Sequence, residues 1–76
     1  MVIQVMGGGC SKCETLLENV KEAVAHTGKT AEIQYVTDFA IIAGKGIMST
    51  PALVIDGKVF SSGRVLKTKE IESLLG

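Results

Sequence analysis

The sequence is poor in aromatic residues and carries no net charge. It has no tryptophan, one tyrosine and two phenylalanines, and its eight basic residues are balanced by eight acidic ones. Proteins that bind nucleic acids need a basic surface for the phosphates, and those that bind single strands also use aromatic rings on which bases stack. We therefore expect no nucleic acid among the partners of this chain.

Long hydrophobic runs are also missing. No stretch approaches the roughly 18 apolar residues of a membrane-spanning helix, and the N-terminus lacks the basic region and hydrophobic segment of a secretory signal. We therefore expect no membrane association and a cytoplasmic location. In that compartment two closely spaced cysteines are more often catalytic or metal-binding than a permanent structural disulfide.

Size and composition indicate a single folded unit. The chain has 76 residues, of which 46% are hydrophobic and 21% charged, so it is too apolar for disorder. A chain of this length is close to the lower limit at which one hydrophobic core suffices. No linker or internal repeat interrupts it. We predict one domain spanning residues 1–76, acting as a monomer.

Hydrophobic periodicity divides the chain into seven elements in the order β-α-β-α-β-β-α. Strands are predicted at 2–6, 32–36, 52–55 and 58–61, and helices at 11–27, 39–43 and 69–75, the last capped by Thr68 with Leu74 facing inward. A helical crossover makes the first two strands parallel, and Asp56-Gly57 is a strong hairpin signal. These patterns predict an α/β fold with a four-stranded mixed sheet of order 2-1-3-4 and helices on both of its faces.

Both cysteines lie in one stretch, Gly7-Gly8-Gly9-Cys10-Ser11-Lys12-Cys13, between the first predicted strand and the first predicted helix. The unpaired N–H groups and partial positive charge of a helix N-terminus favour the thiolate, which is the attacking form of cysteine. The three glycines allow a sharp turn and keep bulk away from the sulfur atoms. This layout favours a redox-active dithiol. Lys12 either lowers the pKa of Cys10 or is simply a solvated residue.

Two other readings of the cysteines remain open at this point. A structural disulfide would close a loop of about four residues, worth only about 2 kcal/mol in the chain-entropy model. Cys10, Cys13 and His26 imitate part of a zinc site, but the fourth ligand is missing, and His26 lies about 24 Å along the helix from Cys10. A Cu(I) or other soft-metal carrier is the stronger rival, because two thiolates satisfy a soft ion.

The second half of the chain favours the redox reading. Cys10-Ser11-Lys12-Cys13 after the first strand, Thr50-Pro51 before the third, and the Asp56-Gly57 hairpin together resemble the thioredoxin/glutaredoxin superfamily. With its glycine-rich lead-in, the chain most resembles the small prokaryotic thioredoxin-like redox-active disulfide proteins. Small copper chaperones share the strand, Cys-x-x-Cys and helix, but not the later features.

The resemblance implies a thioredoxin-like fold over the whole chain and a thiol–disulfide oxidoreductase activity. It implies that Cys10 is the nucleophile, that Cys13 is the resolving thiol, and that their disulfide is the only redox group, with no bound cofactor or metal. The implied partners are protein disulfides and an electron-donating reductase or thiol, which fits a role in electron transport and cell redox homeostasis.

The resemblance also implies a substrate-binding surface around the dithiol. Pro51 would be cis and packed across from the cysteines, with the Thr50 backbone pairing to an incoming peptide. Gly9, Ser11 and Lys12 complete the implied substrate-binding residues. Met48, just before Ser49-Thr50-Pro51, is assigned either to this groove or to the core, and Tyr35 to packing of the second strand.

Three features of the sequence depart from typical thioredoxins. Gly9 replaces the tryptophan that usually precedes the first cysteine, and Ser11-Lys12 replaces the familiar middle pairs. Gln4 stands near the position where many thioredoxins carry a buried acid on the first strand. We therefore expect the proton of Cys13 to need another route.

Overall fold

The computed structural model describes residues 1–75. Along the chain the elements are β1 (Val2–Met6), α1 (Ser11–Thr27), β2 (Glu32–Val36), α2 (Phe39–Gly44), β3 (Ala52–Ile55), β4 (Lys58–Ser62) and α3 (Thr68–Leu75). This is the predicted order, and each boundary lies within one residue of the prediction.

The four strands form one mixed sheet with the predicted order β2-β1-β3-β4. Strand β1 runs parallel to β2 and antiparallel to β3, and β3 and β4 form an antiparallel hairpin. Asp56 and Gly57 at the tip of that hairpin have φ values of 49° and 82°. Both values are positive, as a two-residue type I′ turn requires, and this explains why an Asp-Gly pair occupies the turn.

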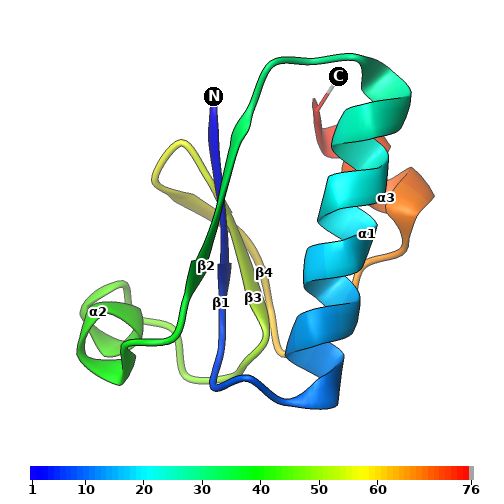
Figure 1. The fold of residues 1–76 in the computed structure, drawn as a ribbon. Coiled ribbons are helices and arrows are strands. Elements are labelled where there is room, and N and C mark those ends of the chain that lie inside the picture. The colour runs from blue at the N-terminus through cyan, green and yellow to red at the C-terminus, as the bar shows by residue number, and fades with distance from the viewer. Residues whose placement is uncertain (76) are drawn as a thin grey trace.

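Helices cover both faces of the sheet, as predicted. Figure 1 shows α1 and α3 packed together on one face and the short α2 on the other, near the end of β1 from which the chain enters α1. The larger core cluster lies between the sheet and the α1–α3 layer and includes Ile3, Val5, Leu16, Leu53 and Ile71. A smaller cluster lies on the α2 side and contains Met6, Ile42, Ile47, Ala52 and Val54.

Strand β1 is central and contributes to both clusters. Ile3 and Val5 face the α1–α3 layer, whereas Met6 belongs to the cluster on the α2 side. Because successive side chains of a strand point to opposite faces, Gln4 also lies on the α2 side. Its amide donates a hydrogen bond of 2.9 Å to the Gln34 side chain of β2.

Helix α1 is amphipathic, with Cys13, Leu16, Val20 and Ala23 buried. It ends at Gly28, whose φ of 68° places it in the left-handed region and whose N–H donates to the Val24 carbonyl. A left-handed residue after the last turn satisfies an otherwise unpaired carbonyl, and glycine adopts that conformation without steric cost. The dithiol sequence therefore stands at the N-terminus of a long helix anchored along its length.

The start and the outer face of α3 differ from the prediction. Thr68 is the first helical residue and not the cap. The preceding Lys67 accepts the first turn's hydrogen bond from Ile71 N–H, and its own N–H donates to Glu70 Oε1 at 3.1 Å. This is half of a capping box, in which an acid three residues on satisfies the cap amide. Leu74 is 39% exposed and does not face inward as predicted.

None of the helices among residues 1–75 combines the length and the apolar character that crossing a bilayer requires.

Candidate functional site

The dithiol loop, Gly7-Gly8-Gly9-Cys10, leaves the sheet at the end of β1. Gly7 is buried, and its N–H donates to the Val36 carbonyl at 3.0 Å, which extends the β1–β2 ladder by one residue. Gly9 has a φ of 83°, a backbone conformation that residues other than glycine rarely adopt. The chain thus turns sharply at Gly9 between the end of β1 and the start of α1.

Cys10 is the N-cap of α1, and its side chain is exposed. Its Sγ accepts a hydrogen bond from the Cys13 N–H at 3.4 Å and lies 2.6 Å from the Cys13 Sγ. The hydrogen bond from the Cys13 thiol and the Cys13 backbone amide lower the pKa of the Cys10 thiol. An N-cap side chain meets the free N–H groups of the first turn, so the cap position itself favours the thiolate.

Cys13 is in the opposite situation. It is fully buried in the first turn of α1. Burial, followed by the hydrogen bond and negative charge of Cys10, raises the pKa of the Cys13 thiol. The pair is therefore asymmetric: the exposed thiol has a lowered pKa, and the buried thiol has a raised pKa.

Gly7 lies against the Cys13 sulfur, and Thr50 lies close to Gly7. A Cβ atom built on Gly7 would overlap the Cys13 Sγ and would lie 3.7 Å from the Thr50 Cβ. The Thr50–Pro51 peptide bond is cis, Pro51 is buried, and Thr50 is exposed at the surface. The stretch before β3 therefore meets the dithiol loop in space, although about 40 positions separate them in the sequence.

The remaining predicted site residues, Gly9, Ser11 and Lys12, are all exposed around Cys10. Lys12 acts on the pKa of the Cys10 thiol through its backbone amide.

The Phe39 side chain flanks the loop on the α2 side. Phe39 is 65% exposed, and its ring lies where a Cβ on Gly8 would approach within 2.9 Å. Met48 is 98% exposed, which excludes the core alternative considered for it. Phe39 was not identified from the sequence, because the apolar segment that it begins reads equally well as a buried helix.

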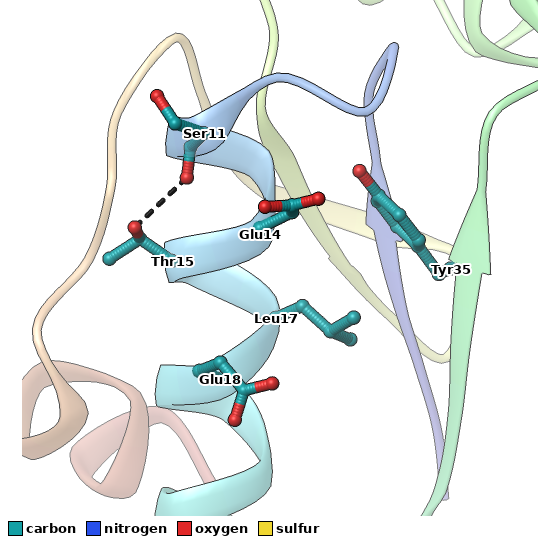
Figure 2. A pocket seen from close by; sticks show the side chains of 6 residues that line it. All are labelled: Ser11, Glu14, Thr15, Leu17, Glu18 and Tyr35. Atoms are coloured by element: carbon teal, nitrogen blue, oxygen red, sulfur yellow. Dashed lines mark hydrogen bonds between the residues drawn. The ribbon is translucent and has the colours of Figure 1, made fainter.

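A hollow of about 570 Å³ opens beside the dithiol loop, between α1 and the edge strand β2. Figure 2 shows its lining residues, which are Ser11, Glu14, Thr15, Leu17, Glu18 and Tyr35. The hydroxyl of Tyr35 points along β2 toward the loop, and the Glu14 carboxylate extends toward it from α1.

Tyr35 is the main residue at this site that the sequence interpretation assigned to packing alone. Its ring packs against the larger core cluster, but its hydroxyl is buried and has no hydrogen-bond partner among residues 1–75. Burial, then the charges of Cys13, Glu14 and Cys10, raise the pKa of the phenol, and the Gly9 amide acts in the opposite direction.

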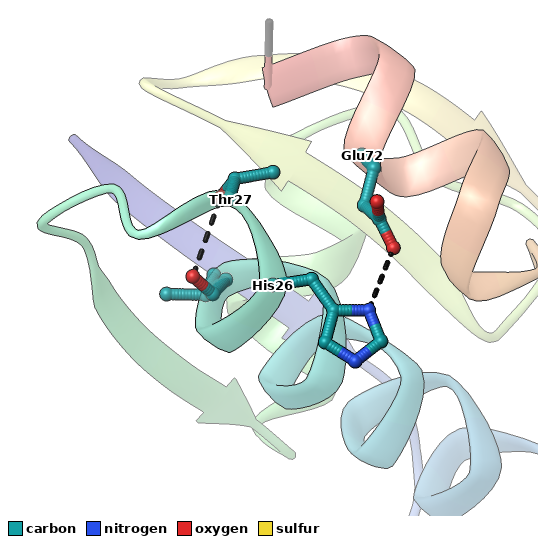
Figure 3. A network of polar contacts seen from close by, with 4 residues as sticks. His26, Thr27 and Glu72 are labelled. Atoms are coloured by element: carbon teal, nitrogen blue, oxygen red, sulfur yellow. Dashed lines mark hydrogen bonds and ion pairs between the residues drawn. The ribbon is translucent and has the colours of Figure 1, made fainter.

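His26 lies away from this site. Figure 3 shows its ring against Glu72 of α3, with the Nδ1 atom 3.1 Å from the carboxylate. Within residues 1–75 no group of three or more histidine, cysteine, aspartate or glutamate side chains converges in a way that could hold a metal ion. The partial zinc ligand set considered from the sequence is therefore not assembled, and nothing favours a soft-metal carrier over a redox dithiol.

Comparison with known proteins yields consistent matches over nearly the whole chain. A family model described as a thioredoxin domain matches residues 1–76. A thioredoxin from Methanothermobacter thermautotrophicus is 36% identical over 75 residues, covering 99% of this chain and 97% of that protein. A thioredoxin from Methanocaldococcus jannaschii is 39% identical over 75 residues, covering 99% of this chain and 86% of that protein.

Proposed function

The chain belongs to the thioredoxin family of thiol–disulfide oxidoreductases, and we propose that Cys10 is its nucleophile and Cys13 its resolving thiol. The observation that carries the proposal is the asymmetry of the pair. The exposed Cys10 has a lowered pKa at a helix N-terminus, and the buried Cys13, whose pKa is raised, lies 2.6 Å away, sulfur to sulfur.

This asymmetry suits exchange in two steps. The Cys10 thiolate attacks one sulfur of the substrate disulfide, the substrate S–S bond breaks, and the leaving sulfur takes up a proton. Cys13 then loses its proton and attacks the Cys10 sulfur of the mixed disulfide. The second substrate thiol is released, and the protein keeps the Cys10–Cys13 disulfide. Run backwards, the same steps oxidise a dithiol.

The substrate side of the proposal rests on the surface around Cys10. The exposed Thr50, next to the buried Pro51, offers its backbone to an extended peptide, and Gly9, Ser11 and Lys12 border the nucleophile. Protein disulfides are the proposed substrates. An electron-donating reductase or a small thiol is the proposed partner that reduces the disulfide back to the dithiol. The proposed location is the cytoplasm, and the proposed active form is a monomer.

The test compares Cys10→Ser and Cys13→Ser with the wild-type protein on a peptide that carries one internal disulfide. We expect Cys10→Ser to abolish reduction and Cys13→Ser to accumulate a mixed disulfide, detected as an adduct by mass spectrometry. A titration in redox buffers should give a reversible two-electron midpoint between roughly −180 and −300 mV.

Two results would contradict the proposal. Unchanged turnover in both variants would remove the cysteines from the mechanism. A metal-free protein that cannot be driven into a reversible internal disulfide, yet captures Cu(I) tightly, would make it a carrier instead.

A further inference from the structure

The hydroxyl of Tyr35 is a buried polar group that meets the geometry of a hydrogen bond with no group among residues 1–75. The Gly9 amide lies close enough to act on the phenol oxygen, but the O–H donor has no acceptor in this part of the chain. Leaving a buried hydroxyl unpaired costs free energy, whereas phenylalanine would fill the same space without that cost. Such a group calls for a functional explanation more than a packing one.

The hydroxyl lies at the dithiol. Strand β2 pairs in parallel with β1 so that Tyr35 stands opposite Val5, two residues before the loop begins. A Cβ built on Gly9 would lie 3.9 Å from the Tyr35 hydroxyl oxygen. Figure 2 shows the phenol directed at this loop across the end of the hollow. Both cysteines are close enough for their charge to act on the phenol, Cys13 more strongly than Cys10.

Cys13 is the thiol whose ionisation is disfavoured. It is fully buried, and it must ionise before it can attack the mixed disulfide. The polar residue of β1, Gln4, faces the α2 side and is engaged with Gln34. β1 contains no ionisable side chain, so the strand beneath the dithiol supplies neither an acid nor a base.

We propose that Tyr35 is a positioning residue for the resolving step, in which its hydroxyl donates a hydrogen bond, directly or through one water molecule, to the negative charge that forms on Cys13. Tyr35 stays neutral and transfers no proton in net terms. Cys13 gives its proton to water, its sulfur forms the bond to Cys10, and the substrate sulfur leaves with the electron pair of the broken S–S bond. The role in exchange rests on the function proposed above.

Few other ionisable groups surround the phenol. From α1 and its cap it faces Cys10, Cys13 and Glu14, with Glu18 further along the same hollow. On its own strand the other ionisable side chain is Glu32, which lies on the opposite face and accepts a hydrogen bond from Gln34. The carboxylates oppose a negative charge on Cys13, whereas backbone groups of Cys10 and Gly8 favour it. A neutral donor at position 35 would add to that favourable set.

The first experiment does not depend on exchange activity. In a Cys10→Ser background, the rate of Cys13 alkylation is measured against pH with and without Tyr35→Phe. We expect the midpoint for Cys13 ionisation to rise by about one pH unit without the hydroxyl, equivalent to a tenfold loss or about 1.4 kcal/mol. Ser61→Ala is the matched control, because Ser61 Oγ is also buried and has no hydrogen-bond partner in the described part of the chain, but Ser61 lines a separate hollow beside α3.

The second experiment follows the intact dithiol. Tyr35→Phe should lengthen the lifetime of the mixed disulfide about tenfold at neutral pH, with the rate of Cys10 alkylation unchanged within twofold. Ser61→Ala should change neither rate.

The inference is overturned if Tyr35→Phe leaves the Cys13 midpoint unchanged. It is also overturned if both cysteines and the unfolding midpoint shift together, because that pattern indicates a packing role. If Cys13 titrates as expected but the wild-type protein exchanges no disulfide, the hydrogen bond stands and the proposed function fails.

Discussion

Replacing Gly7 with alanine should damage the site by filling the space that Cys13 occupies. The added Cβ would overlap the Cys13 Sγ and would lie 3.2 Å from the Cys13 Cβ. The cysteine side chain is short and fully buried, so it has no free volume into which to move. Overpacking of this kind lowers the free energy of unfolding by about 1–3 kcal/mol. The substitution also reduces the conformational entropy of the unfolded chain, which stabilises the folded state by only about 0.4–1 kcal/mol.

The steric cost wins, and we expect Gly7→Ala to lower the free energy of unfolding by about 1–2 kcal/mol. For a domain of this size that corresponds to a fall in Tm of roughly 4–16 °C. The measurement is urea unfolding and thermal melting of the reduced protein with excess small thiol present. Alkylation of Cys13 in the folded state should also become faster, because its sulfur is pushed out of its enclosure.

Gly44→Ala is the matched control. Gly44 is the last residue of α2, and a Cβ there would meet nothing within 4 Å. The same substitution should then be neutral or stabilise by up to about 1 kcal/mol. If Gly7→Ala proves as stable as Gly44→Ala, with Cys13 equally protected, the account of Cys13 as enclosed by the loop is wrong.

Four further outcomes follow from the contacts described. Alkylation of the reduced protein should begin at Cys10, with a midpoint below that of an ordinary thiol, while Cys13 reacts only at higher pH; equal midpoints by mass mapping would refute the asymmetry. A protein carrying Cys13 alone should lose stability as pH rises above about 8.5, because the folded state then binds more protons than the unfolded one; urea midpoints that are flat from pH 7 to 10 would contradict this. His26→Ala removes an exposed contact with Glu72 and should change the free energy of unfolding by no more than about 1 kcal/mol. A larger loss would show that this pair contributes substantially to the packing of α1 on α3. Asp38→Ala should cost about 1 kcal/mol of stability, because its carboxylate caps α2, and Asp38→Asn should restore most of it.

The order and type of the elements could be predicted because the local signals agree with the tertiary structure. The hairpin turn at Asp56-Gly57 needs two positive φ values, and Gly28 ends α1 in the left-handed region, so each turn is encoded by one or two adjacent residues. The start of α3 could not be placed correctly because two caps compete. Thr68 has the better cap side chain, but the Glu70 carboxylate reaches the Lys67 amide and moves the start by one residue.

The site was predictable where it depends on sequence neighbours and not where it depends on register. A Cys-x-x-Cys before a helix predicts which thiol is exposed at the cap and which lies in the first turn. The approach of Tyr35 depends on how far β2 slides along β1, and no local signal in the alternating strand gives that offset. Met48 was ambiguous for a related reason, because only the path of the loop before Pro51 decides that it is exposed.

The hydrogen bond between Gln4 and Gln34 has a consequence for how this protein can tolerate length changes. A slip of one residue between β1 and β2 would turn Tyr35 to the α2 face and bring Gln34 into the apolar layer under α1. The amide pair holds the two strands in the working alignment independently of the segment that joins α1 to β2. Insertions at 29–31 should therefore lengthen the connection without changing the strand register. A single residue added inside either strand would change the register and move the phenol away from the sulfur atoms.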